Sequence, residues 1–279
     1  IGVAKIEGNE LKEDINKAVN LKQDIVNKCG VNYGTDASVH GEGITVKGDN
    51  LYVLASVNLY GTYTDYDDGY IIQYGIGSDG TLTYKNFARV GKNYDSTRLN
   101  IYNGKIFVSA IGGDQKYGAG NSETALHVAD ISGDELKSES YKIKVPSNVK
   151  CDFRDLKVLP DGTAYVMTYN LGNSGTSVDL HVYKTTVSNL LSDSPNNWQE
   201  IITQATEGSF GKLDAEYYTK RLWTEIGNTL SVYTDGSTTP LAWEAKDFGN
   251  NSNYYNFNSL IMLQPDTVTG ETAKLTITN

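Results

Sequence analysis

The sequence predicts an all-β chain in which five similar sheet units form one closed ring. Three observations lead to this prediction. A pair of short β-type runs recurs five times, a second pair follows most copies of the first, and the first twelve residues match one of the second pairs. The abundance of Gly, with 28 residues, and of Tyr, with 20, fits many tight turns between half-buried strands.

The first pair consists of an apolar-alternating run, a turn rich in Gly, Asp or Asn, and a second β-type run. Asn-Gly at 103–104 and Asp-Gly at 161–162 are strong hairpin signals. Repeats of this kind decide the fold, so they take precedence over other patterns. The five copies cover residues 44–57, 99–110, 156–168, 222–233 and, more loosely, 260–277.

The second pair supplies the outer strands of each unit. Its copies cover residues 70–84, 126–137, 180–202 with an insert, and a degenerate 241–245. No fifth copy follows Asn279, but residues 1–12 align without gaps on residues 126–137. We therefore expect one domain, 1–279, whose last sheet unit is split between 1–20 and 254–279. Such a split closes the ring and removes exposed sheet edges.

A helical alternative exists for part of the N-terminal region. Leu11, Ile15, Val19 and Ile25 or Val26 roughly fit the apolar stripe of an amphipathic helix within residues 9–28. The stretch 18–28 fits it best, because the repeat alignment before it favours strand. A helix there leaves the ring intact, since closure needs only residues 3–12.

Taken together, these repeats resemble those of β-propeller proteins, with four-stranded blades and an Asn-Gly or Asp-Gly turn between the two inner strands. The resemblance implies a five-bladed β-propeller closed by its N-terminal strands. The sequence carries no WD dipeptide, kelch pattern or Asp-box that would name a subfamily. Propellers host lectins, glycosidases and interaction scaffolds alike, so the fold alone does not define an activity.

Charge and composition exclude several classes of binding partner. The formal net charge is −10, which argues against nucleic acid, because phosphate binding needs clustered Lys and Arg. No apolar run is long enough for a transmembrane helix, and two cysteines exclude a disulfide-rich scaffold or a multi-cysteine metal site. The chain begins with Ile1 rather than Met, which we interpret as the start of a processed or excised product. Origin from a larger surface protein is consistent with that start. We expect an extracellular or cell-surface location.

The candidate site lies where the loops enter the inner strands, because these loops gather at the mouth of a propeller funnel. Polar and charged side chains precede each inner strand. The predicted ligand-binding residues are His40, Asp95, Arg98, Asp152, Arg154, Asp155, Asp214, Arg221, Tyr254 and Tyr255. The main functional interpretation is a non-catalytic recognition module that binds a glycan or a cell-surface protein there, so no catalytic residue is assigned.

Two other functions stay open. A carbohydrate-active enzyme would use funnel carboxylates, since five-bladed glycoside hydrolases place three carboxylates on successive inner strands. Asp36 or Glu42, Asp95, and Asp152 or Asp155 fit that arrangement. A structural piece of a larger surface assembly would need no ligand, and its funnel charges would be ion pairs.

Three further features carry predictions. Asp65, Asp67 and Asp68 lie within one acidic loop, where a calcium ion is the cofactor that oxygen ligands would favour, although a solvated turn is the alternative. Cys29 and Cys151 both precede inner strands, so a disulfide across the mouth is predicted beside the alternative of two buried thiols. His127 and His181 occupy equivalent third strands and are assigned no metal role.

Overall fold

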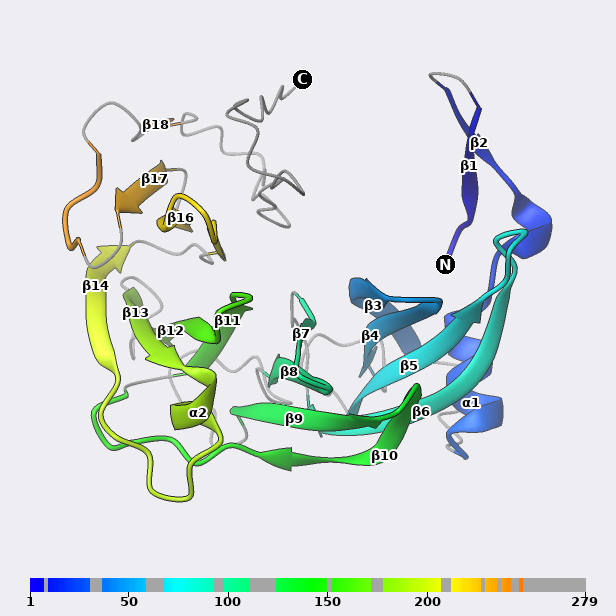
Figure 1. Ribbon diagram of the computed structural model, residues 1–279, viewed down its shortest axis with the longest axis horizontal. Coiled ribbons are helices and arrows are strands. Elements are labelled where there is room, and N and C mark those ends of the chain that lie inside the picture. The colour runs from blue at the N-terminus through cyan, green and yellow to red at the C-terminus, as the bar shows by residue number, and fades with distance from the viewer. Residues whose placement is uncertain are drawn as a thin grey trace.

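A computed structural model describes most of the chain. The described residues are 1–7, 10–30, 37–58, 68–92, 98–110, 124–149, 152–171, 178–206, 212–226, 229–234, 237–241 and 246–247. Their strands form four successive four-stranded units and one separate hairpin, which follow one another around an arc (Figure 1). This arrangement confirms the predicted fold class, an all-β propeller.

Each blade is an antiparallel meander whose strands follow in chain order. Blade 1 contains β3 (Ser38–Lys47), β4 (Asn50–Asn58), β5 (Asp68–Ile76) and β6 (Leu82–Lys92). Blade 2 contains β7 (Asn100–Tyr102), β8 (Lys105–Ala110), β9 (Ala125–Ser132) and β10 (Glu135–Lys142). Blade 3 contains β11 (Asp152–Val158), β12 (Thr163–Leu171), β13 (Val178–Thr186) and β14 (Gln199–Thr206). Blade 4 contains β15 (Lys212–Ala215), β16 (Arg221–Ile226), β17 (Thr229–Thr234) and β18 (Lys246–Asp247).

The N-terminal hairpin has the register that the repeat alignment predicts. Strands β1 (Ala4–Glu7) and β2 (Glu10–Glu13) pair Ile6 with Leu11, just as β9 and β10 pair Ile131 with Leu136. Residues 1–12 therefore form the same hairpin as residues 126–137. Its expected partners, the inner strands within 254–279, lie outside the described residues.

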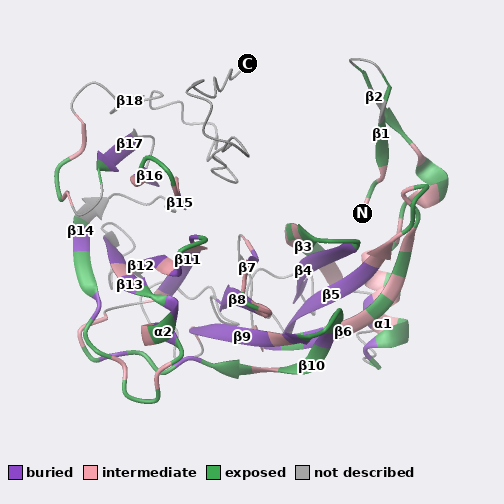
Figure 2. Ribbon diagram, viewed as in Figure 1, coloured by how far each residue is buried: buried purple, intermediate pink, exposed green. Residues whose placement is uncertain are grey.

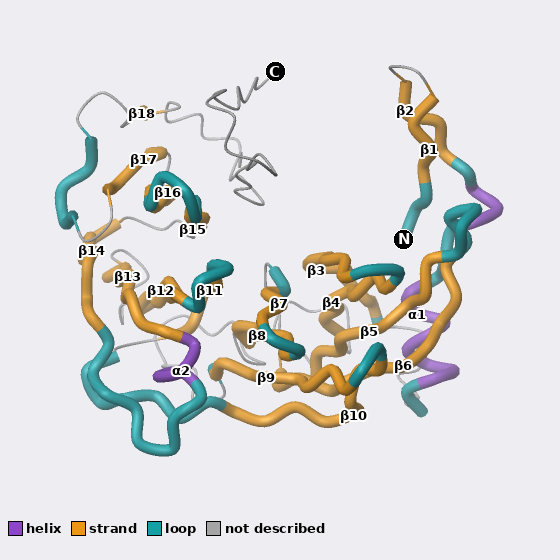
Figure 3. The backbone as a smooth tube through the Cα atoms, in the orientation of Figure 1, coloured by secondary structure: helices purple, strands orange, loops and turns teal. Residues whose placement is uncertain are grey.

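Helix is present where the alternative placed it. A 3₁₀ turn, η1 (Ile15–Lys17), precedes α1 (Leu21–Lys28), and the Asn20 side chain caps α1 by accepting a hydrogen bond from the Gln23 amide. Ile25 of α1 is buried against blade 1, so the helix packs on the face of that blade that points away from blade 2 (Figure 3). The short α2 (Val187–Leu190) follows β13 and joins the core of blade 3.

In blade 4 the strand assignment from the sequence was wrong by one strand. The run 222–233 is not the inner pair but the second and third strands, β16 and β17. The inner strand is β15, which pairs Lys212 with Glu225 and Ala215 with Leu222. Consequently Asp214 lies within the inner strand, whereas Arg221 begins the return strand, on the far side of the hairpin.

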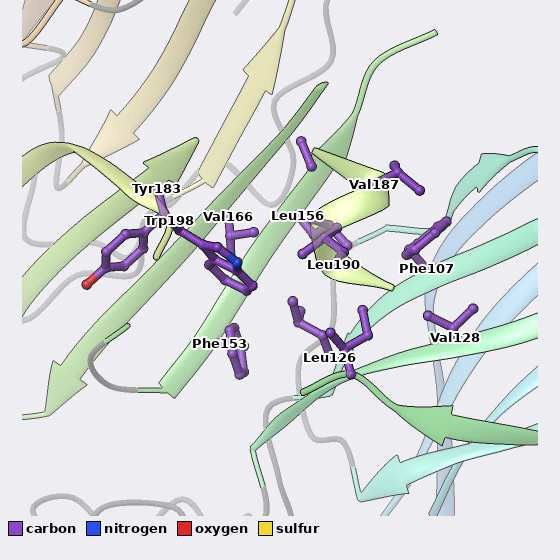
Figure 4. Close-up of a cluster of buried hydrophobic side chains, with 12 residues drawn as sticks. Phe107, Leu126, Val128, Phe153, Leu156, Val166, Tyr183, Val187, Leu190 and Trp198 are labelled. Atoms are coloured by element: carbon purple, nitrogen blue, oxygen red, sulfur yellow. The ribbon is translucent and has the colours of Figure 1, made fainter. Parts of the chain in front are cut away.

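Apolar side chains fill the spaces between neighbouring blades. The buried residues concentrate on the strands (Figure 2). Between blades 2 and 3, Phe107 and Leu126 pack in one cluster with Phe153, Leu156 and residues of α2 (Figure 4). A second cluster joins blade 3 to Leu213, Ala215 and Leu222 of blade 4. The stability of each blade thus depends on its neighbours, because each apolar face is buried against the next blade.

Blades 1 and 2 are also joined by backbone pairing and by side-chain hydrogen bonds. The backbones of the outer strands β6 and β10 pair in parallel at Arg89 and Glu139. The buried Gln73 side chain donates to the Asp134 carbonyl (2.5 Å) and accepts from the Leu136 amide (2.9 Å). This junction therefore combines apolar packing with specific hydrogen bonds.

His127 lies at the same junction, and its environment predicts acid sensitivity. The ring packs so closely on Gly91 of β6 that a Cβ at position 91 would lie 2.5 Å from Nε2. Burial lowers the pKa of His127 to about 4. His127 has a higher pKa in the unfolded chain than in the folded protein, so protonation of this side chain favours unfolding. The contribution of neutral His127 to stability is therefore complete above about pH 6.5 and is lost as the pH falls towards 4. We expect a loss of about 3 kcal/mol from this group alone.

The variant His127→Gln should remove this change in the free energy of unfolding with pH. The control His40→Gln, which replaces an exposed histidine, should leave it unchanged. Urea unfolding at pH 4.5 and at pH 7 measures both. Equal slopes in wild type and His127→Gln would contradict the assignment.

Candidate functional site

The inner strands of blades 3 and 4 run side by side in the same direction. Contacts between them occur in the same order along both strands. The Leu213 amide donates a hydrogen bond to Asp155 Oδ2 (3.0 Å). Further along both strands, Lys157 Nζ lies 2.6 Å from Asp214 Oδ1. The chain enters both strands at one end, here called the entrance end, and the hairpins that follow them lie at the hairpin end.

Arg98 connects three blades near the axis. It stands just before β7 of blade 2, and its Nε lies 3.1 Å from Asp155 Oδ1 on β11. Its Nη1 lies 3.3 Å from Asp214 Oδ1 on β15, which also contacts Lys157 Nζ at 2.6 Å. We call Arg98, Asp155, Lys157 and Asp214 the axial ion cluster. Sequence reasoning selected three of its members but not Lys157.

The carboxylates of this cluster are held by backbone groups as well. Asp155 accepts hydrogen bonds from the amides of Leu156 (2.9 Å) and Leu213 (3.0 Å), and Asp214 accepts one from Ala215 (2.8 Å). Both side chains are buried, Asp155 completely. Carboxylates whose oxygens already bind amides and guanidinium groups fix the blades in place, so this cluster has a structural role.

Glu225 differs from the axial carboxylates. It lies on β16 opposite Lys212, the first residue of β15, and is therefore at the entrance end. The residue is only 1% exposed, and within the described part of the chain neither carboxyl oxygen has a hydrogen-bond partner. Burial raises the pKa of Glu225 to about 7, although the nearby charges of Lys212 and Arg154 lower it in part.

A carboxyl group with this pKa can exchange a proton near neutral pH, which is the property required of a general acid. Sequence reasoning missed Glu225 because it assigned 222–233 to the inner hairpin. A signal was available: Glu225 interrupts a β-type run between Thr224 and Ile226.

Other predicted residues are placed as follows. Asp152 and Arg154 lie in the first half of β11, Asp152 half-buried and Arg154 buried beside Glu225. His40 is exposed on β3, and its Nε2 lies 3.1 Å from Ser38 Oγ. Arg221 was expected at the mouth but begins β16 at the hairpin end, because β15 rather than β16 is the inner strand. Asp95, Tyr254 and Tyr255 lie outside the described residues.

The predicted metal and disulfide sites are largely beyond the described residues. Asp65, Asp67 and Cys151 lie outside them, and Asp68 is the first residue of β5. Cys29 is a buried thiol whose pKa is raised to about 12 by burial, and its bond to Cys151 stays a prediction from the sequence. Among the residues described, no group of three or more His, Cys, Asp or Glu could hold a metal ion.

His127 and His181 lie in third strands, as the sequence predicts, and both side chains are buried. His181 Nδ1 contacts Glu200 Oε1 at 2.5 Å on the neighbouring strand. In the described parts of the chain, no helix is both long and apolar enough to span a membrane.

Comparison with known proteins gives structural neighbours only. No protein-family model and no curated protein matches the chain. A GH43_1 enzyme from Xanthomonas citri complexed with xylotriose is 10% identical, with 72% of each chain covered and a TM-score of 0.43. The protein BT0996, in an RGII complex, is 11% identical over 74% of this chain and 75% of its own, with a TM-score of 0.45. A glycoside hydrolase is 12% identical over 76% of this chain and 75% of its own, with a TM-score of 0.47.

These neighbours correct the main functional interpretation. The sequence was interpreted as a non-catalytic recognition module and more as a binder than an enzyme, but the neighbours are glycoside hydrolases. They agree better with the alternative, a carbohydrate-active enzyme.

Proposed function

We propose that this protein is a carbohydrate-active enzyme that cleaves glycosidic bonds with carboxyl groups at the entrance end of its inner strands. The observation that carries the proposal is Glu225, a buried carboxyl group without hydrogen-bond partners among the described residues and with a pKa near 7. Asp155 and Asp214 instead accept hydrogen bonds from backbone amides and pair with Arg98. Perturbed acids of this kind concentrate at active sites.

Glycoside hydrolysis needs two carboxyl groups with different tasks. One, in its protonated form, gives a proton to the leaving glycosidic oxygen, and the other, ionised, activates water or attacks the sugar. Glu225 suits the first task because burial keeps its proton bound up to about pH 7. Asp152, half-buried at the start of β11, is the described carboxylate that suits the second, and Asp95 stays a further candidate from the sequence.

The test is Glu225→Gln, which removes the exchangeable proton while keeping the side-chain size. Turnover should fall by about 100-fold or more, the usual contribution of a general acid. Release of reducing ends from a panel of xylan, arabinan, pectin and aryl glycosides measures it. Wild-type activity should also decline as the pH rises through about 7, because the proton donor ionises.

Two matched variants complete the experiment. Asp152→Asn should lower turnover as well, whereas Glu139→Gln, on the exposed side of β10, should leave it unchanged. Full turnover by Glu225→Gln would contradict the assignment, and no turnover of any substrate by the wild type would contradict the proposed function. A glycan ligand belongs to this proposal, while the extracellular location and the calcium ion stay predictions from the sequence.

A further inference from the structure

The hairpin end carries a second group of side chains, remote from the entrance end. The hairpins that follow the inner strands of blades 2, 3 and 4 meet there. Lys220 of the blade 4 hairpin lies 2.6 Å from Asp161 of the blade 3 hairpin. The adjacent Gly162 lies against Tyr102 of blade 2, since a Cβ at position 162 would be 2.9 Å from the Tyr102 hydroxyl.

Lys220 is held in a fixed position within this group. Its backbone has a φ of +55°, a left-handed conformation that costs free energy in a residue other than glycine. Its Nζ pairs with Asp161 and lies 4.3 Å from the centroid of the Tyr217 ring. The hydrogen bond from Lys220 lowers the pKa of Asp161 to about 2, so this carboxylate is ionised at neutral pH.

Aromatic side chains lie beside these charges. The rings of Tyr217 and Tyr218 meet edge to face with centroids 5.1 Å apart, and Tyr218 is 50% exposed. Glu216 accepts a hydrogen bond from the half-buried Trp223 ring nitrogen (3.0 Å) and one from Thr219. Exposed aromatic surface therefore alternates with ordered charged groups within one hairpin.

This mixture suits a sugar better than a protein partner. The C–H face of a sugar ring packs on an aromatic ring, and its hydroxyls bond to neighbouring carboxylate and ammonium groups. Among the described residues of these hairpins, Tyr218 is the one large apolar side chain that is well exposed. The apolar surface that one tyrosine side chain exposes is far smaller than the surface that a stable protein interface buries.

We propose that Tyr217, Tyr218, Lys220, Asp161 and Glu216 form a second glycan-binding site, which holds a polysaccharide on the face opposite the entrance end. It does not require Glu225 or any reaction. Its benefit rests on the proposed function: a chain attached to a polymer has a higher local concentration of substrate at the entrance end.

Affinity electrophoresis in native gels containing xylan, arabinan, pectin or cellulose derivatives tests this site without any need for turnover. We expect at least one polysaccharide to retard the wild type and Tyr218→Ala to lose about tenfold in affinity. Tyr141→Ala is the matched control, because Tyr141 is also exposed (43%) and also has a lysine, Lys105, over its ring at 5.7 Å.

The outcomes separate this site from the proposed catalytic one. Retardation that Glu225→Gln keeps and Tyr218→Ala loses supports the second site, whatever the activity. Retardation lost in Glu225→Gln but kept in Tyr218→Ala would place the polysaccharide at the entrance end and overturn the inference. Absence of retardation by every polysaccharide would overturn it too.

Discussion

Replacement of Asp155 by alanine is expected to lower the free energy of unfolding by about 3–5 kcal/mol, the usual cost of breaking a buried ion pair by removing one partner. Asp155 is fully buried and contacts Arg98 from blade 2 and the Leu213 amide from blade 4. The substitution removes the contacts from blade 3 to Arg98 of blade 2 and to the Leu213 amide of blade 4, and it leaves that buried amide without its acceptor. Chemical unfolding followed by tryptophan fluorescence measures the loss.

A matched control exists within the same blade. Asp193 also pairs with a lysine, Lys144, at 2.9 Å, but its side chain is 96% exposed. Asp193→Ala should therefore have no measurable effect, because exposed ion pairs contribute little. If Asp155→Ala were as stable as Asp193→Ala, the axial ion cluster would not hold the blades together.

Local sequence signals predicted most of the fold because turn chemistry is local. Asn103, Gly104 and Gly162 have positive φ values, as the Asn-Gly and Asp-Gly turns require, and they fix the hairpins of blades 2 and 3. The match of residues 1–12 to 126–137 predicted the β1–β2 hairpin with its register. These features depend on residues close together in the chain.

Blade 4 shows where such signals fail. Its inner strand, Lys212–Ala215, has four residues and two of them are charged, so it lacks the alternation expected of a buried strand. Asp214 is buried there because Arg98 and Lys157, from two other blades, compensate its charge. A one-dimensional pattern does not contain those partners.

The sequence selected residues that converge near the axis, but it did not predict the chemistry of each one. Selecting residues before inner strands found Arg98, Asp155 and Asp214, which do converge. Whether a carboxylate stabilises blades or transfers a proton depends on its burial and on the donors around it. That difference separates Asp155, which is saturated with hydrogen bonds, from Glu225, which has none among the described residues.

The variant Glu225→Gln is expected to be more stable than wild type above neutral pH. Glu225 has a pKa of about 7 in the folded protein against an ordinary value of 4.5. The wild type therefore loses about 3 kcal/mol of stability as the pH rises from about 4.5 through 7, because the unfolded chain ionises this group freely. Glutamine has no proton to lose, so the variant should gain about that amount at pH 8 and almost nothing at pH 4.

Glu225 makes the folded protein less stable as the pH rises, whereas His127 makes it less stable as the pH falls over a similar range. The whole protein can therefore have a flat stability profile that hides both groups, and each is measured as the difference between wild type and its own variant. Glu139→Gln, which removes an exposed carboxylate from β10, should show no such difference at either pH. A loss of stability at pH 8 in Glu225→Gln would mean that an ionised Glu225 stabilises Lys212 and Arg154. A gain in stability accompanied by a loss of turnover would identify a carboxyl group that is kept buried for its reactivity and against the stability of the fold.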